Sequence, residues 1–120
     1  MNKIQALHSF WSSFNLKAYD EYSVPDDANL PYITYEVSSS DFGGTLANTA
    51  SLWYRSSSWS EITAKEQAIA NYITRGGRMI KYDGGAFWIQ KASPWAQRMD
   101  DPSDELIRRI VLNVTIEFLD

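Results

Sequence analysis

The chain has 120 residues, contains no cysteine and carries a formal net charge of −4. This length fits a single domain spanning residues 1–120. The missing thiols exclude disulfides, thiolate metal sites and a cysteine nucleophile. The sequence contains no dense patch of Lys and Arg of the kind that would favour nucleic-acid binding. Polar residues interrupt the first fourteen residues, so we predict neither a signal peptide nor a membrane span there.

The N-terminal half predicts a helix followed by a hairpin. Apolar residues at helical spacing predict an amphipathic helix over residues 3–14. Turn-forming residues predict a connecting loop over residues 15–31. Alternating apolar residues predict a strand over residues 32–38. A polar connection then leads to a second strand over residues 47–56, and the two strands form a hairpin with a long loop.

A second helix is predicted over residues 59–75. Ser58 and Glu61 have the spacing of a capping box, and Gly76-Gly77 is a helix stop with one glycine in the left-handed conformation. Asp83-Gly84-Gly85 then predicts a tight hairpin between strands 78–82 and 86–91. Residues 92–105 are predicted to form a polar loop.

The final strand, residues 106–119, organises the predicted fold. Its alternate residues from position 110 to position 118 are all apolar, which is typical of a strand with one face in a core. The predicted order is helix, strand, strand, helix, strand, strand, strand. This order indicates an α+β domain of two layers, with two helices packed on one face of a mostly antiparallel sheet.

The residues do not predict an enzyme. His8 is the only histidine, and no GxSxG motif places a serine for attack. No carboxylate lies in an apolar run that would raise its pKa for acid–base catalysis. The acidic residues near positions 20–27 lack the ligand spacing of a calcium loop and are predicted to form a solvated turn. Those at 100–105 could suggest a metal site, but Asp101-Pro102 predicts a solvated turn there as well. We therefore expect no catalytic residue, no metal site and no cofactor.

An assembly protein is the more economical interpretation. It requires a compact scaffold, exposed loops, and aromatic and arginine anchors. We predict that the loops 38–46 and 92–105 carry partner contacts, with Trp95 and Arg98 as the preferred anchors and Phe42 next. Trp95 has an alternative role as a core side chain beneath its loop.

A ligand-binding module is the alternative from another functional class. Aromatic residues make up 14% of the chain, and a sugar-binding sheet would use exposed coplanar rings. Trp53, Trp88 and Trp95 could serve in that way. The sequence does not distinguish which of these three rings are exposed.

Several runs of the chain resemble a known family. The runs FWSSFNLKAYDEYSVPDDANLPYITYEV, ASLWYRSSSWSEI, RGGRMIKYDGGAFWI and PWAQRMDDPSDELIRRIVLNVTIEFL resemble small tail proteins of long-tailed, siphovirus-like bacteriophages and prophages. The resemblance covers nearly the whole chain. Within that family the chain is most similar to tail terminator, or tail-completion, proteins.

The resemblance implies a structural α+β subunit that forms a homo-oligomeric ring, expected to be a hexamer, at the head-proximal end of the virion tail. Such a ring, assembled in the bacterial host cytoplasm, would stop growth of the tail-tube protein and dock to head–tail connector proteins. DNA would pass through it without specific binding, which the acidic net charge suits. It implies no membrane partner and transfers no functional residue to this chain. A head-completion or head–tail connector protein is the alternative within virus assembly.

Overall fold

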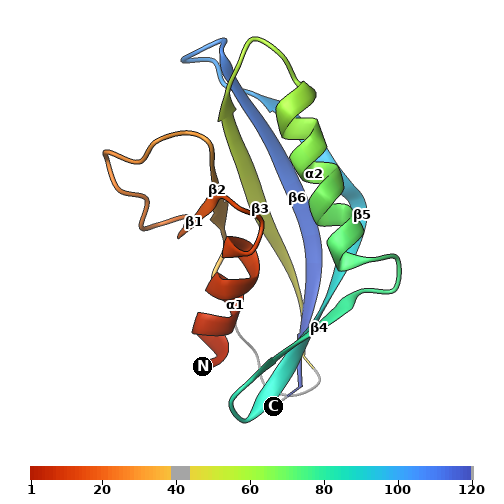
Figure 1. Ribbon diagram of the computed structural model, residues 1–120. Coiled ribbons are helices and arrows are strands. Elements are labelled where there is room, and N and C mark those ends of the chain that lie inside the picture. Colours follow the sequence, from red (N-terminus) through yellow and green to blue (C-terminus); the bar gives the residue numbers. More distant parts are fainter. Residues whose placement is uncertain (39–43, 120) are drawn as a thin grey trace.

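The structure, a computed structural model, describes residues 1–38 and 44–119. The described residues form an α+β fold in which two helices accompany one six-stranded, mostly antiparallel sheet (Figure 1). The strand order across the sheet is β1-β2-β3-β6-β5-β4. The elements are α1 (Lys3–Ser12), β1 (Lys17–Asp20), β2 (Tyr32–Tyr35), β3 (Thr45–Arg55), α2 (Ser60–Ile73), β4 (Arg78–Tyr82), β5 (Gly85–Asp100) and β6 (Ile107–Phe118).

Strand β6 lies in the middle of the sheet. It pairs antiparallel with β3 on one side and with β5 on the other. Its five alternate apolar side chains, from Ile110 to Phe118, are each at most 3% exposed, whereas the residues between them are half-buried. The prediction that one face of this strand lies in the core is confirmed.

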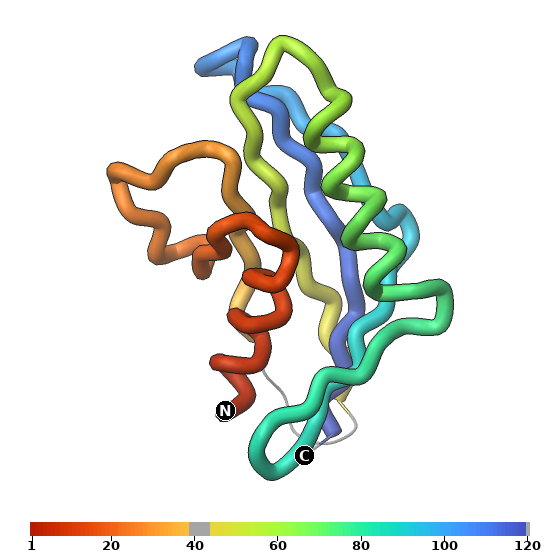
Figure 2. Tube along the Cα trace, viewed as in Figure 1, coloured from red at the N-terminus to blue at the C-terminus, as the bar shows by residue number. Residues whose placement is uncertain are grey.

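Both helices contribute side chains to a single core cluster. α1 buries Phe10 and Trp11, and α2 buries Ile62, Ile69 and Ile73, against the inward-facing residues of the strands. In Figures 1 and 2 α2 runs alongside β6 and β5, and α1 lies beside β1 and β2.

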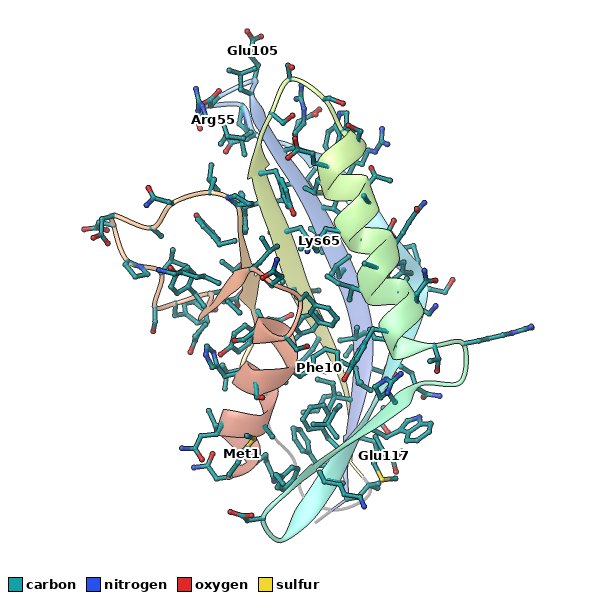
Figure 3. The ribbon with its side chains drawn as sticks, viewed as in Figure 1. Met1, Phe10, Arg55, Lys65, Glu105 and Glu117 are labelled. Carbon is teal, nitrogen blue, oxygen red and sulfur yellow. The ribbon has the colours of Figure 1, made fainter. Side chains whose placement is uncertain are left out.

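A hydrogen bond joins α2 to the segment just after α1. Figure 3 shows Lys65 on α2, whose Nζ donates a 2.7 Å hydrogen bond to the carbonyl oxygen of Phe14, just beyond α1. Neither helix is long and apolar enough to cross a membrane, within the part of the chain that the structure describes.

The hairpin of β4 and β5 has the predicted tight turn. Tyr82 pairs with Gly85, and Gly84 takes φ +86°, which a glycine adopts without steric cost. Gly77 also takes a left-handed φ, +94°, as predicted for the helix stop. A Cβ on Gly77 would lie 2.7 Å from Gln90 Cγ and from Trp88 Nε1, so glycine is needed there for space as well as for conformation.

The predicted loop over residues 15–31 is wrong in its first part. Residues 17–20 form β1, which pairs parallel with β2 from Lys17↔Tyr32 to Asp20↔Tyr35. The predicted element order therefore lacks one strand. The sequence KAYD is too short to show a two-residue period, and its strand conformation depends on the ladder that β2 offers.

The predicted loop over residues 92–105 is also wrong. β5 continues to Asp100, and a register shift between Lys91 and Ala96 takes up the irregular segment around Ser93-Pro94. A bulge of this kind lets a strand pass a proline without ending. Of the predicted loop over residues 92–105, only the part after Asp100, between β5 and β6, forms a turn.

The predicted capping box at the start of α2 is not formed. Trp59 is the N-cap residue and makes no side-chain capping hydrogen bond. The hydroxyl of Ser58 accepts instead from the backbone N–H of Ser60, at 3.1 Å. This hydrogen bond between Ser60 and Ser58 replaces the expected bond between the Ser58 hydroxyl and the backbone N–H of Glu61.

Candidate interaction site on the open face of the sheet

Trp95 is held against α2. It is half-buried, packs against the core cluster and donates from Nε1 to the carboxylate of Glu66 at 3.1 Å. It lies on the bulged part of β5, and its role as a partner anchor stays a prediction.

Arg98 is exposed on the regular part of β5, three residues after Trp95. Its guanidinium carbon lies 4.7 Å from the centroid of the Trp59 ring, and that of Arg108 lies 5.2 Å from the same ring. Stacking of this kind uses the negative face of the indole. Arg98 and Trp95 therefore both contact the α2 region, but different residues within it. Phe42 lies outside the described residues.

The sheet face opposite the core cluster carries a row of large side chains. Strand register aligns Tyr32 on β2 with Trp53 on β3, then with Arg109 on β6 and Met99 on β5. Directly paired residues on neighbouring strands point to the same face, so these four side chains form one row. The first three are half-buried, and Met99 is exposed.

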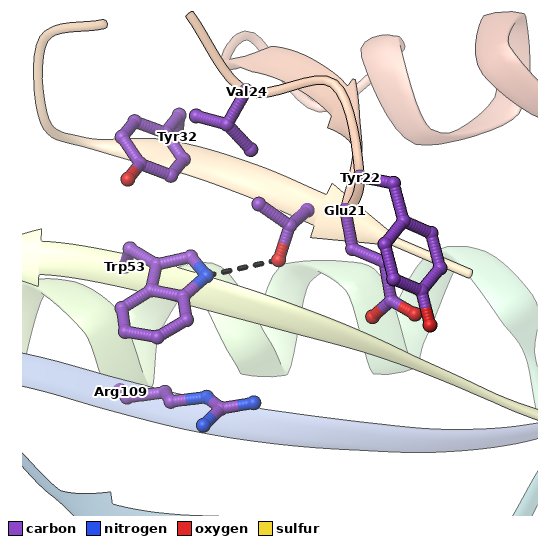
Figure 4. Close-up of a pocket in the computed structure, with 7 residues that line it drawn as sticks. Glu21, Tyr22, Val24, Tyr32, Trp53 and Arg109 are labelled. Atoms are coloured by element: carbon purple, nitrogen blue, oxygen red, sulfur yellow. Dashed lines mark hydrogen bonds between the residues drawn. The ribbon is translucent and has the colours of Figure 1, made fainter. Parts of the chain in front are cut away.

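The row borders a hollow that the loop after β1 helps to build (Figure 4). Glu21, Tyr22 and Val24 line it from that loop, and the sheet supplies Tyr32, Thr34, Trp53 and Arg109. The hollow has a volume of about 380 Å³. Tyr22 is 89% exposed, the most exposed large apolar side chain of the described residues.

Hydrogen bonds hold the base of this hollow in place. Trp53 donates from Nε1 to the hydroxyl of Thr34 at 2.9 Å, shown as the dashed line in Figure 4. Arg109 lies with its guanidinium carbon 4.5 Å from the centroid of the Trp53 ring and donates from Nε to the hydroxyl of Ser51 at 3.2 Å. The two terminal nitrogens of Arg109 make no hydrogen bond to any described residue.

The arrangement suits the capture of a protruding side chain. A fixed indole and a phenol ring provide apolar contact area, and the free guanidinium donors can bind a carbonyl or carboxylate oxygen. Trp, Tyr and Arg are the residue types that contribute most binding energy at protein interfaces.

A second polar cluster lies beside α1 and does not form a hydrolase triad. His8 Nδ1 lies 2.9 Å from the hydroxyl of Tyr35, and its Nε2 lies 3.2 Å from the hydroxyl of Ser12. Burial, and then the negative charge of Asp20, raise the pKa of Tyr35. A neutral phenol therefore occupies the position where a triad has the carboxylate that stabilises an imidazolium.

The acidic turn between β5 and β6 is organised by its own hydrogen bonds. Bonds from the side chain and then the backbone of Ser103 lower the pKa of Asp101. The backbone N–H of Leu106, followed by Arg55, lowers the pKa of Asp104. Across residues 1–38 and 44–119, no group of three or more His, Cys, Asp or Glu side chains is placed to hold a metal ion.

The sequence prediction missed the hollow because its residues are brought together by strand pairing. Trp53 and Arg109 are 56 positions apart, and they meet only because β3 pairs with β6. The one signal in the sequence was that both residues alternate with the buried residues of their strands, which places them on the outward-facing side of the sheet.

Comparisons of the chain with protein-family models, with curated proteins and with solved structures find no match.

Proposed function

We propose that this chain is a structural protein of phage tail assembly, a tail terminator whose ring stops tail-tube growth and presents a surface for head docking. The proposal includes a two-layer domain in which both helices cover one face of the sheet. The opposite face and the two sheet edges then remain for neighbouring subunits and partners. DNA passes through the ring without specific binding, at the head-proximal end of the virion tail.

The observation that carries the proposal is the hollow on the open face. It presents an indole ring, a phenol ring and an arginine with free donors on a rigid sheet. These groups are suited to a protein partner, because rigid aromatic side chains lose little conformational entropy on binding. The family resemblance of the sequence supports the particular partner, a ring of tail-tube protein.

The experiment is a tube-capping assay. Tail-tube protein from the same viral genome is polymerised with and without this chain, and tube lengths are measured by electron microscopy. The chain should shorten the tubes and appear at one end of each. Arg109→Ala and Tyr22→Ala should weaken capping, whereas Glu105→Ala, at the far turn between β5 and β6 (Figure 3), should not.

Unchanged tube lengths at saturating amounts of the wild-type chain would contradict the terminator role. Binding to portal or connector protein in the same experiment, without binding to the tube, would favour a head-completion or head–tail connector protein.

A small-molecule-binding module is the second candidate, and the aromatic lining of the hollow is the observation that favours it. Trp53 and Tyr32 could stack on a sugar ring in a space of about 380 Å³. Titration of tryptophan fluorescence against a panel of sugars tests this function. A saturable change that Trp53→Phe abolishes would support it, and a flat response would exclude it for the sugars tested.

A further inference from the structure

We propose that opposite edges of the sheet bind each other in neighbouring copies of this chain. The acidic loop after β1 of one copy would contact the basic β4 edge of the next copy, head to tail. This inference deepens the proposed function, since it supplies the subunit contact that a ring requires. It rests on that proposal only for the closure of the assembly into a ring.

The acidic edge is the loop of residues 20–31, which Figure 2 shows projecting away from the rest of the chain. The loop carries four acidic residues and no Lys or Arg. Glu21, Asp26 and Asp27 are exposed, and Tyr22 stands among them at 89% exposure. Lys17, the nearest basic residue along the chain, lies at the other end of β1, and Arg109 lies across the hollow from Glu21 and Tyr22.

The basic edge consists of Arg75, Arg78 and Lys81, on and just before β4. No acidic residue lies within residues 75–81. Arg78 is fixed, because its Nε donates to the carbonyl oxygen of Tyr72 at 2.6 Å and its guanidinium carbon lies 4.1 Å from the Tyr72 ring centroid. Asp83, in the following turn, is bonded to the N-terminal amine.

Each edge also has an apolar centre. Tyr22 provides it on the acidic edge, and Met79, which is 46% exposed and shares a face of β4 with Lys81, provides it on the basic edge. An exposed aromatic residue among charges of one sign, opposite an apolar patch among charges of the other sign, is the usual composition of a specific contact.

The sheet topology fixes the symmetry of this contact. β1 and β4 are the two terminal strands of the sheet, so the acidic and basic edges lie at its opposite sides. A twofold dimer through either edge would bring charges of the same sign together. Repeated head-to-tail contact instead joins opposite charges at every interface and builds a ring or a filament.

Sedimentation of the purified chain is the first test. Assemblies should form at low salt and dissociate between about 50 mM and about 500 mM NaCl, because the charges of an exposed contact are screened over that range. A chain that stays monomeric at low salt and high concentration would overturn the inference. It would leave the terminator function open, because the tube could template the ring.

Charge reversal gives the decisive test. Glu21→Lys/Asp26→Lys/Asp27→Lys gives the loop of residues 20–31 a net positive charge, so both edges are basic, and Arg75→Glu/Lys81→Glu makes both edges acidic. None of these five side chains forms a hydrogen bond to a described residue, so both variants should fold. Each alone should associate at least about tenfold more weakly than the wild type, and an equimolar mixture should recover assembly with the two variants alternating.

The matched control is Asp100→Lys/Glu105→Lys, which reverses two exposed charges near the turn between β5 and β6. It should assemble like the wild type. Equal association by all variants, or a mixture that does not recover assembly, would overturn the proposed contact. Tube capping by Arg75→Glu/Lys81→Glu, which should no longer assemble alone but leaves the residues of the hollow unchanged, would separate this inference from the proposed function.

Discussion

Asn48 is a buried polar residue whose replacement should stabilise the fold. It lies on the inward-facing phase of β3, opposite Val114, and is 5% exposed. Neither its side-chain nitrogen nor its side-chain oxygen has a hydrogen-bond partner in the described structure. Asn48→Leu replaces the amide with an apolar group of nearly the same shape.

The expected gain follows from the cost of an unpaired amide. A buried polar group without a partner costs about 1–3 kcal/mol. The free energy of unfolding of Asn48→Leu should therefore rise by about 1–3 kcal/mol. Asn48→Ala removes the same amide but leaves a cavity, so its gain should be smaller.

The neighbouring residue provides an opposite-sign control. Thr49 donates from its hydroxyl to the carboxylate of Glu36 at 2.6 Å. Thr49→Val keeps the shape and loses this bond, so it should destabilise by about 1 kcal/mol. Urea unfolding followed by tryptophan fluorescence measures all three variants. A loss of stability in Asn48→Leu would show that the amide has a partner in the folded protein and would refute the reasoning.

Three further predictions can be checked by the same unfolding assay. Gly77→Ala should lower the free energy of unfolding by about 2 kcal/mol or more, because its Cβ would clash with β5 at a left-handed φ. Gly76→Ala should lower it much less, because its Cβ meets nothing within 4 Å. Equal effects of the two substitutions would contradict this reasoning. Trp95→Phe should destabilise by about 1 kcal/mol through loss of the bond to α2, and no change would show that this bond is not formed in solution. The pKa values of Asp101 and Asp104 are lowered from 3.8 in the folded state, so their ionised forms stabilise the fold above pH 3.8. This stabilisation is lost as the pH falls through the folded-state pKa values. Asp101→Asn/Asp104→Asn should therefore flatten the acid side of the plot of unfolding free energy against pH.

The parts of the fold that the sequence predicted are those whose signal is local. The alternation of β6, the Asp-Gly turn before Gly85 and the glycine stop after α2 each depend on a few adjacent residues. β1 and the second half of β5 were missed because their strand conformation depends on a partner ladder. Trp53 and Arg109 were missed as a site for the same reason, since only the β3–β6 register brings them together.

The central position of β6 has a consequence for the order of folding. β6 is the last of the described strands along the chain, yet it is the only strand that joins the β1-β2-β3 half of the sheet to the β5-β4 half. The pairs between β3 and β6 span roughly 50–70 residues, and contacts of such sequence separation form slowly. Until β6 is in place, β3 and β5 each have an open edge that can pair with another chain. During synthesis these residues are therefore most prone to aggregate just before β6 leaves the ribosome.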